Sequence, residues 1–195
     1  METIVLASNN KNKIKEFKKI LTNYNIIPME DIGFDQDIVE DGKTFLDNSL
    51  IKTNTIAKYC KEKGLNYMVM ADDSGLCVDA LNGEPGVYSA RYAGNHDHQA
   101  NRKKLLENLK NVEDPNRTAS FVCSITLKKP DRTTLVAEGK VDGKILKQET
   151  GTMGFAYDCL FFCNELNKCF GECSEEEKNS VSHRGRAIQN LLKQL

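Results

Sequence analysis

The sequence predicts an α/β protein, because strand patterns and helix patterns both occur along it. Residues 3–7 and 67–71 are short apolar runs, which are typical of buried strands. Residues 14–21 instead carry apolar side chains at helical spacing, with lysines on the opposite face. Two β-rich runs, 117–128 and 133–141, are separated by a proline-containing turn and predict a long hairpin.

A polar loop joins the first strand to the first helix and is a candidate anion site. Residues 8–13 read Ser-Asn-Asn-Lys-Asn-Lys. Free backbone N–H groups at a helix N-terminus attract anionic oxygens, and Lys11 and Lys13 add positive charge. Because the Walker-type phosphate loop motif is absent, a solvated, lysine-rich helix start is the alternative.

A second strand and a second helix are expected next. Residues 26–29 predict a short strand, which a loop rich in Asp and Gly follows. Thr44 and Asp47 have the spacing of a capping box, which predicts a helix from there to about residue 63. Asn48 and Lys52 are four residues apart and therefore share one face of that helix. From the residues alone, Lys52 is interpreted as an exposed lysine.

The most informative stretch begins with the apolar run 67–71. We expect this strand to end at Asp72 and Asp73, with a turn at Ser74 and Gly75. Oxygen ligands at the carboxyl ends of strands lie where open α/β sheets bind ligands. Adjacent carboxylates repel each other, and a hard cation such as Mg²⁺ neutralises them. The alternative is an ordinary turn, since Asp, Ser and Gly are common turn residues.

The last part of the chain contains two further polar patterns. Phe155 and Asp158 offer a ring to stack on a base and an acceptor to hydrogen-bond it, although residues 155–158 also fit a core strand. Ser182 is a natural N-cap of a C-terminal helix. A basic cluster surrounds that cap and needs a negative or carbonyl-rich partner: Lys178, His183 and Arg184.

Composition limits the classes of function. The chain has 195 residues, 39% of them hydrophobic and 28% charged, which predicts one domain over residues 1–195. Its net charge of −1 argues against a sequence-independent nucleic-acid binder. The N-terminal residues show no basic leader with a long apolar core, and no run is long enough to span a membrane. We therefore expect a cytoplasmic protein with neither nucleic-acid nor membrane partners.

Seven cysteines are many for such a chain. The number is odd and a reducing compartment is expected, so disulfides are not predicted. Four of the cysteines lie close together in the sequence, but they lack the Cys-x-x-Cys pairs that are diagnostic of zinc. Buried or scattered thiols are the preferred interpretation, with zinc as the alternative, for Cys159, Cys163, Cys169 and Cys173.

Five sequence blocks carry a resemblance to a known family. The longest is ADDSGLCVDALNGEPGVYSARYAG, residues 71–94. Two blocks precede it, VLASNNKNKIKEF and EDGKTFLDNSLIKT. Two blocks follow it, GTMGFAYDCLFF and EEEKNSVSHRGRAI. Together they resemble the non-canonical purine nucleotide pyrophosphatases, the inosine/xanthosine triphosphate pyrophosphatase (HAM1-like) family. The resemblance covers nearly the whole chain.

The resemblance implies a mixed α/β fold around a long twisted sheet, with two lobes flanking an active-site cleft, and a homodimer. It implies Mg²⁺-dependent hydrolysis of purine nucleoside triphosphates (ITP, dITP, XTP) to the monophosphate and pyrophosphate. The implied metal ligands are Glu40, Asp72 and Asp73, and Asp73 is the candidate base for the attacking water. The implied substrate-binding residues are Ser8, Asn9, Asn10, Lys11, Asn12, Lys13, Lys52, Ser74, Phe155, Ala156, Tyr157, Asp158, Lys178, His183 and Arg184.

The chain departs from the family pattern at Asn9, Ala156 and Cys159, where relatives usually have glycine, glycine and proline. Asn tolerates left-handed backbone, whereas Ala156 adds a methyl group where the backbone approaches the ligand. Two other functions stay open: a Maf-like pyrophosphatase with another base preference, and a nucleotide-binding module without turnover. The complete set of three carboxylates argues against the second.

Overall fold

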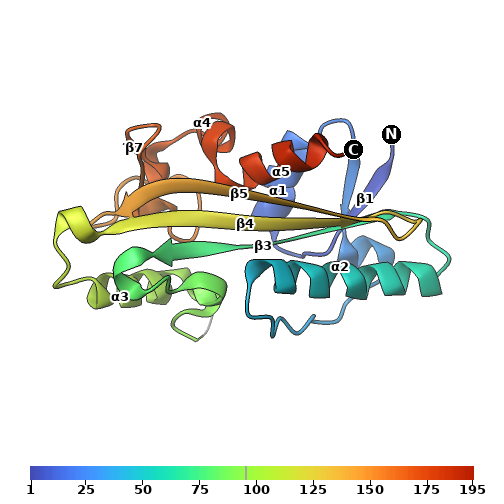
Figure 1. Cartoon of the computed structure of the whole chain (residues 1–195), viewed down its shortest axis with the longest axis horizontal. Helices are drawn as coiled ribbons and strands as arrows, with labels where there is room; N and C mark the ends of the chain where they lie inside the picture. Colours follow the sequence, from blue (N-terminus) through green and yellow to red (C-terminus); the bar gives the residue numbers. More distant parts are fainter. Residues whose placement is uncertain (95) are drawn as a thin grey trace. The chain divides into compact units, whose positions relative to one another are not determined.

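The protein is described from a computed structural model, which describes residues 1–94 and 96–195. These residues form a mixed α/β fold with a seven-stranded sheet in the order β2-β1-β3-β4-β5-β6-β7 (Figure 1). β1 pairs in parallel with β2 and β3, whereas β6 pairs antiparallel with β5 and β7. The strands are Thr3–Leu6, Asn25–Pro28, Met68–Val78, Thr118–Lys128, Thr134–Ile145, Phe161–Cys163 and Lys168–Cys169, numbered β1 to β7 in this order.

The α-helices begin where the sequence places capping residues. Asn10 caps the first helix, and the predicted box of Thr44 and Asp47 is present at the start of the second. A second capping box, Ser174 with Glu177, begins the fourth. The helices are α1 Lys11–Ile20, α2 Phe45–Glu62, α3 His98–Asn108, α4 Glu175–Val181 and α5 His183–Leu192. No helix in the part of the chain that the structure describes is long and apolar enough to cross a membrane.

Two compact units divide the chain. Unit 1 comprises Met1–Asp73, Ser124–Glu138 and Ala187–Leu195, and unit 2 comprises Ser74–Cys123 and Gly139–Arg186. In unit 1, apolar side chains of β1 and β3 pack against Ile56 and Cys60 of α2. Burying an aliphatic side chain of this kind stabilises the fold by about 1.5–3 kcal/mol, so this core fixes α2 against the sheet.

The core of unit 2 is richer in aromatic side chains. The Phe121 ring lies 4.7 Å from that of Phe161, which in turn lies 5.1 Å from that of Phe170. Arg117 is buried nearby and donates to the carbonyl oxygens of Leu109 and Ile145 at 2.7 and 2.8 Å. These bonds compensate the burial of the guanidinium, although burial still lowers its pKa.

The predicted end of the central strand is wrong. β3 continues through Asp72, Asp73, Ser74 and Gly75 to Val78, so this segment is neither a strand end nor a turn. Beyond the carboxylates, the side chains of Leu76 and Val78 are again apolar and fully buried, and their packing keeps this part of β3 in the sheet. The sequence pattern missed this because two carboxylates inside a buried strand are stable only with nearby cations, which are distant in sequence.

The strand β5 extends to Ile145, and its Gly143 pairs with Cys163 of β6. One smaller expectation needs correction. Residues 155–158 do not form a core strand: Tyr157 and Asp158 are buried, but Asp158 begins a short 3₁₀ turn, Asp158–Leu160. The hairpin, by contrast, is confirmed as β4 and β5.

Candidate active site

Asp72 and Asp73 lie just beyond the carboxyl end of β1. β1 ends at Leu6, which is in register with Met70 of the parallel strand β3. The backbone N–H of Ala7 then donates to the Met70 carbonyl at 2.8 Å. The carboxylates therefore stand at the carboxyl edge of β1, where open α/β sheets bind ligands, although their own strand continues.

The start of α1 contributes Lys13 to these carboxylates. The Lys13 Nζ lies 3.0 Å from Asp72 Oδ2, whose side chain is fully buried. The predicted cradle of free N–H groups is not formed, because Asn10 Oδ1 accepts from the backbone N–H groups of Asn12 and Lys13 at 3.0 and 3.2 Å. Ser8 Oγ likewise accepts from the Asn10 N–H at 3.1 Å. Positive charge at this helix start thus comes chiefly from Lys13 together with the helix dipole.

One face of α2 supplies Asn48 and Lys52. The Lys52 Nζ lies 2.9 Å from Glu40 Oε2 and 3.8 Å from Asp73 Oδ1. Asn48 Nδ2 donates to Asp73 Oδ2 at 2.9 Å, and Asn48 Oδ1 accepts from the Gly42 N–H at 2.8 Å. The interpretation of Lys52 as exposed is wrong, since the residue is only 7% exposed. A lysine so buried needs carboxylate partners, and α2 places Lys52 against two of them, Glu40 and Asp73.

These six residues form the carboxylate cluster of unit 1: Lys13, Glu40, Asn48, Lys52, Asp72 and Asp73. Burial by itself would lower the pKa of Lys52, but the charges of Asp73, Asp72 and Glu40 together raise it, so the amine stays protonated. Burial raises the pKa of Asp73, against the opposing effect of Lys52, Lys13 and the Asn48 bond. Three carboxyl groups and two ammonium groups are thus brought together in this cluster.

The chemistry of the donors fits a hard divalent cation. Glu40, Asp72 and Asp73 provide carboxylate oxygens, which Mg²⁺ prefers, and two of the three are buried. Within the described residues, no three acidic, histidine or cysteine side chains are already arranged around a metal position. The lysine contacts explain this, because ammonium groups sit against the oxygens that a cation would use. A cation that used Asp72 Oδ2 or Glu40 Oε2 would displace Lys13 or Lys52 from that oxygen.

A second cluster lies in unit 2 around Lys178 of α4. The Lys178 Nζ donates to Asp158 Oδ2 at 2.7 Å and lies 4.8 Å from the centre of the Phe155 ring. The same carboxylate oxygen accepts from the Phe155 N–H at 2.8 Å. Both charged side chains are nearly fully buried, so this is a neutral, hydrogen-bonded pair beside an aromatic face.

The residues at the start of α5 complete this Lys178 cluster. His183 stacks on the Phe121 ring, with centroids 4.9 Å apart and planes 15° apart. Arg184 Nη2 donates to Ser74 Oγ at 2.9 Å. Ser182 is the predicted N-cap, since its Oγ accepts from the Gly185 N–H at 3.1 Å. The Lys178 cluster thus comprises Ser74, Phe155, Asp158, Lys178, His183 and Arg184.

Other predicted site residues lie in neither cluster. Tyr157 is 2% exposed and its hydroxyl donates to the Ser89 carbonyl at 2.8 Å, so it is part of the core. Ala156 has a left-handed backbone, with φ of +53°, which explains the glycine usual there. Asn9 is not among the left-handed non-glycine residues of the described chain, so its tolerance of that conformation is unused. Asn9, Lys11 and Asn12 are exposed.

Asn48 is a functional candidate that the site prediction omitted. The available signal was that Asn48 shares a helix face with Lys52. That signal does not reveal its partner, because Asp73 lies 25 positions further along the chain. The cysteines form no disulfide among the described residues. Burial raises the pKa of Cys169 to about 11 and also raises the pKa of Cys159 and Cys173. Protonated, buried thiols agree with the preferred structural interpretation of this group.

Comparison with known proteins identifies the family. The model of the Ham1 family matches residues 4–194. The chain belongs to the Ham1 family. A dITP/XTP pyrophosphatase of Clostridium perfringens is 52% identical over 195 residues, which cover 98% of this chain and 96% of that protein. A dITP/XTP pyrophosphatase of Bacillus subtilis is 42% identical over 198 residues, covering 100% and 98%.

Solved structures of Ham1 proteins have the same fold. The Ham1 protein of Staphylococcus aureus superposes with a TM-score of 0.84 at 44% identity, covering 96% of this chain and 95% of that one. A Ham1 protein of Coxiella burnetii superposes with a TM-score of 0.86 at 37% identity, covering both chains fully. The expected mixed α/β fold class is therefore confirmed.

Proposed function

We propose that this Ham1-family chain is a nucleoside triphosphate pyrophosphatase that hydrolyses ITP, dITP and XTP to the monophosphate and pyrophosphate. The observation that carries the proposal is the carboxylate cluster, where three acidic side chains meet two lysines beside a helix N-terminus. The relatives named as dITP/XTP pyrophosphatases support the choice of substrate. Hydrolysis between the α and β phosphates removes faulty purines from the nucleotide pool.

Glu40, Asp72 and Asp73 would hold Mg²⁺. When bound, the ion supplies positive charge to the phosphate oxygens and to the leaving pyrophosphate. The ammonium groups of Lys13 and Lys52 already lie in the cluster, against Asp72 and Glu40. When the substrate binds, they exchange these carboxylate contacts for contacts with phosphate oxygens. The loop residues Ser8, Asn9, Asn10, Lys11 and Asn12 lie beside this phosphate site at the start of α1, where the helix dipole and the charge of Lys11 favour an anion.

Asp73 orients the attacking water and accepts its proton. The Asn48 amide fixes the Asp73 carboxylate through its 2.9 Å hydrogen bond, so one oxygen is held while the other faces Lys52. A positioned base typically contributes 10²–10⁴-fold to a rate, about 3–5 kcal/mol of barrier. Asn48 is thus a positioning residue for Asp73.

The Lys178 cluster selects the base. Phe155 offers a ring for stacking, and Lys178, His183 and Arg184 offer donors to the oxygen at the purine 6-position. Adenine presents an amino group there and leaves buried donors unpaired, at about 1–3 kcal/mol each. Ser74, Ala156, Tyr157 and Asp158 support these residues, the last by fixing both Lys178 and the Phe155 backbone.

We also propose that residues 1–195 fold as one cytoplasmic domain that forms a homodimer and binds no nucleic acid. The boundaries between the two units fall inside β3, β4, β5 and α5. Because three strands and one helix are each divided between the units, the two units are expected to unfold in a single transition.

A substrate panel tests the function. Purified protein with Mg²⁺ is assayed for pyrophosphate release from ITP, XTP, GTP, ATP and a modified pyrimidine triphosphate, before and after chelation. We expect release from ITP and XTP, little from ATP, and none without divalent cation. Preferential turnover of the pyrimidine would support the Maf-like alternative, and binding of ITP without release would support a nucleotide-binding module.

A further inference from the structure

The segment 155–158 is tied to α3 by a contact outside both clusters. Arg102 of α3 donates through Nε to Glu149 Oε1 at 2.7 Å and through Nη1 to the Ala156 carbonyl at 3.0 Å. All of these residues belong to unit 2. Arg102 therefore joins the helix, the loop that carries Glu149 and the segment that carries Phe155 and Asp158.

The carbonyl that Arg102 holds belongs to a strained residue. Ala156 has φ of +53°, a left-handed conformation that is unfavourable for a residue with a Cβ atom. The segment therefore has a reason to relax to a different backbone, which would move Phe155 and Asp158. A charged donor on the Ala156 carbonyl opposes that relaxation, because a hydrogen bond to a charged group is stronger than a neutral one.

Glu149 orients Arg102 and also contacts Cys159, which directly follows the segment. Its carboxylate hydrogen-bonds the Cys159 side chain, and the Thr150 N–H donates to the Cys159 carbonyl at 2.7 Å. Ala156 and Cys159 are the two positions in this block where the chain departs from the family pattern. The Arg102–Glu149 pair thus contacts both of them.

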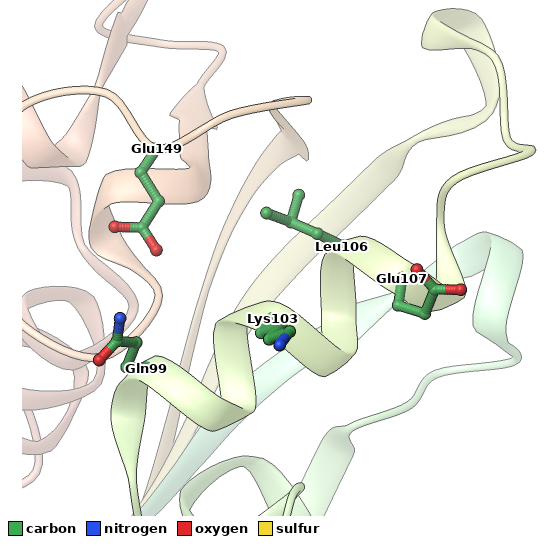
Figure 2. A pocket seen from close by; sticks show the side chains of 5 residues that line it. All are labelled: Gln99, Lys103, Leu106, Glu107 and Glu149. Carbon is green, nitrogen blue, oxygen red and sulfur yellow. The ribbon is translucent and has the colours of Figure 1, made fainter.

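Glu149 faces α3 across a pocket of unit 2. Figure 2 shows Glu149 on its loop opposite Gln99, Lys103, Leu106 and Glu107, all on α3. The Glu149 side chain is 47% exposed, whereas that of Arg102 is 18% exposed. Water screens the ion pair from the pocket side, so the directional bond to the Ala156 carbonyl is the stronger constraint on the segment.

We propose that Arg102 is a positioning residue for base recognition, which holds Ala156 in its left-handed conformation and thereby places Phe155 and Asp158. The inference rests on the proposed function, because base binding is the property that the segment serves. It assigns Arg102 no contact with substrate. Its removal should therefore weaken nucleotide binding while the chemical step, which depends on the carboxylate cluster, stays nearly constant.

Steady-state kinetics with ITP test this assignment. Arg102→Met is expected to raise KM about tenfold and to change kcat less than twofold, with Arg102→Lys in between. Arg186 provides a matched control, since it also donates to one carboxylate, Glu165, and one carbonyl, that of Lys140. Arg186→Met is expected to leave KM within twofold of the unmodified protein.

The decisive variant combines Arg102→Met with Ala156→Gly. Glycine adopts the left-handed backbone without strain, so the double variant should recover most of the lost affinity. An unchanged KM in Arg102→Met, or a folded double variant with no recovery, would overturn the inference. If the unmodified protein releases no pyrophosphate from ITP, the proposed function fails instead.

Amide hydrogen exchange tests the same constraint without turnover. Arg102→Met should accelerate exchange over residues 150–160, whereas Arg186→Met should leave it unchanged there. Equal exchange in both variants would contradict the tether. Should Arg102→Met fail to fold, Arg102→Lys is compared with the unmodified protein and should also exchange faster over these residues, since one ammonium cannot hold both oxygens in the fork geometry of arginine.

Discussion

The two clusters pair buried charge differently. In unit 1, three carboxyl groups lie against two lysines, and Glu40 keeps 30% of its side chain exposed. In unit 2, Asp158 and Lys178 form one ion pair, with side chains only 5% and 7% exposed. The first arrangement groups several carboxylates, and the second contains a single one.

This difference indicates how each cluster meets a ligand. A group of several carboxylates suits a divalent cation and tolerates the exchange of lysine contacts for phosphate contacts. A fully paired Lys178–Asp158 unit instead presents a rigid edge of donors beside aromatic rings, which suits recognition of a neutral base. Chemistry and selection are accordingly expected to respond separately to substitution.

The largest expected effect separates chemistry from binding. Asp73→Asn should lower kcat for ITP by 10²–10⁴-fold, because the general base is lost, while KM changes little. Burial raises the pKa of Asp73 above that of an ordinary carboxyl. Ionisation of Asp73 therefore opposes folding at neutral pH, and the folded protein gains stability from this group as the pH falls. The neutral variant should therefore stay folded, which a thermal melt checks.

Asp37 gives the control for that experiment. It lies exposed on the loop before Glu40, so Asp37→Asn removes a charge from the same segment without touching the cluster. We expect unchanged turnover in this variant. Full activity in Asp73→Asn would contradict the assignment of the base.

The next effect concerns selection. Lys178→Met should reduce the preference for ITP over ATP by roughly tenfold to a hundredfold, because one or two donors to the 6-position are lost. The ratio of kcat/KM for the two substrates measures it. Lys168→Met is the control, since Lys168 pairs with Glu177 of the same helix but is half-exposed. A preference retained in Lys178→Met would remove the Lys178 cluster from base recognition.

A third prediction compares the stability of the two clusters. Lys178→Met leaves Asp158 buried without its cation and should lower the free energy of unfolding by about 3–5 kcal/mol. Lys52→Met should cost only about 1–2 kcal/mol, because Asp73 keeps the Asn48 bond and Glu40 is partly hydrated. Urea unfolding of both variants at pH 7 gives the comparison. The reverse order would show that the carboxylate cluster is the more tightly coupled one.

The smallest effect concerns the cysteines beside the Lys178 cluster. With a pKa of about 11, roughly 0.1% of the Cys169 thiol is ionised at pH 8. Iodoacetamide should therefore label the folded protein at least tenfold more slowly than the guanidinium-unfolded chain. Mass spectrometry of the Cys169 peptide follows the reaction. Stoichiometric zinc in the purified protein would contradict the interpretation of these residues as structural thiols.

Local signals predicted much of the fold and part of the site. Thr44 and Ser182 lie where the sequence indicates helix starts, because caps depend on hydrogen bonds between residues close together in the chain. The β4–β5 hairpin was recognisable for the same reason. The site residues themselves came from the family resemblance, and the structure groups Glu40, Lys52, Asp72 and Asp73 in one cluster without testing their roles.

What the sequence alone could not predict depends on partners far apart in the chain. The strand that continues through Asp72 and Asp73, and the burial of Lys52, each result from charges that approach one another only in the folded protein. Arg102 gave no sequence signal, because its partners lie 47 and 54 positions away.

The sequence by itself determined the starts of two helices, the hairpin and membership of the family, because these follow from short-range hydrogen bonding and from contiguous motifs. Only the tertiary structure decided which charges are neutralised. Desolvation makes an unpaired buried charge costly, so the position of each carboxylate depends on cations that folding brings to it.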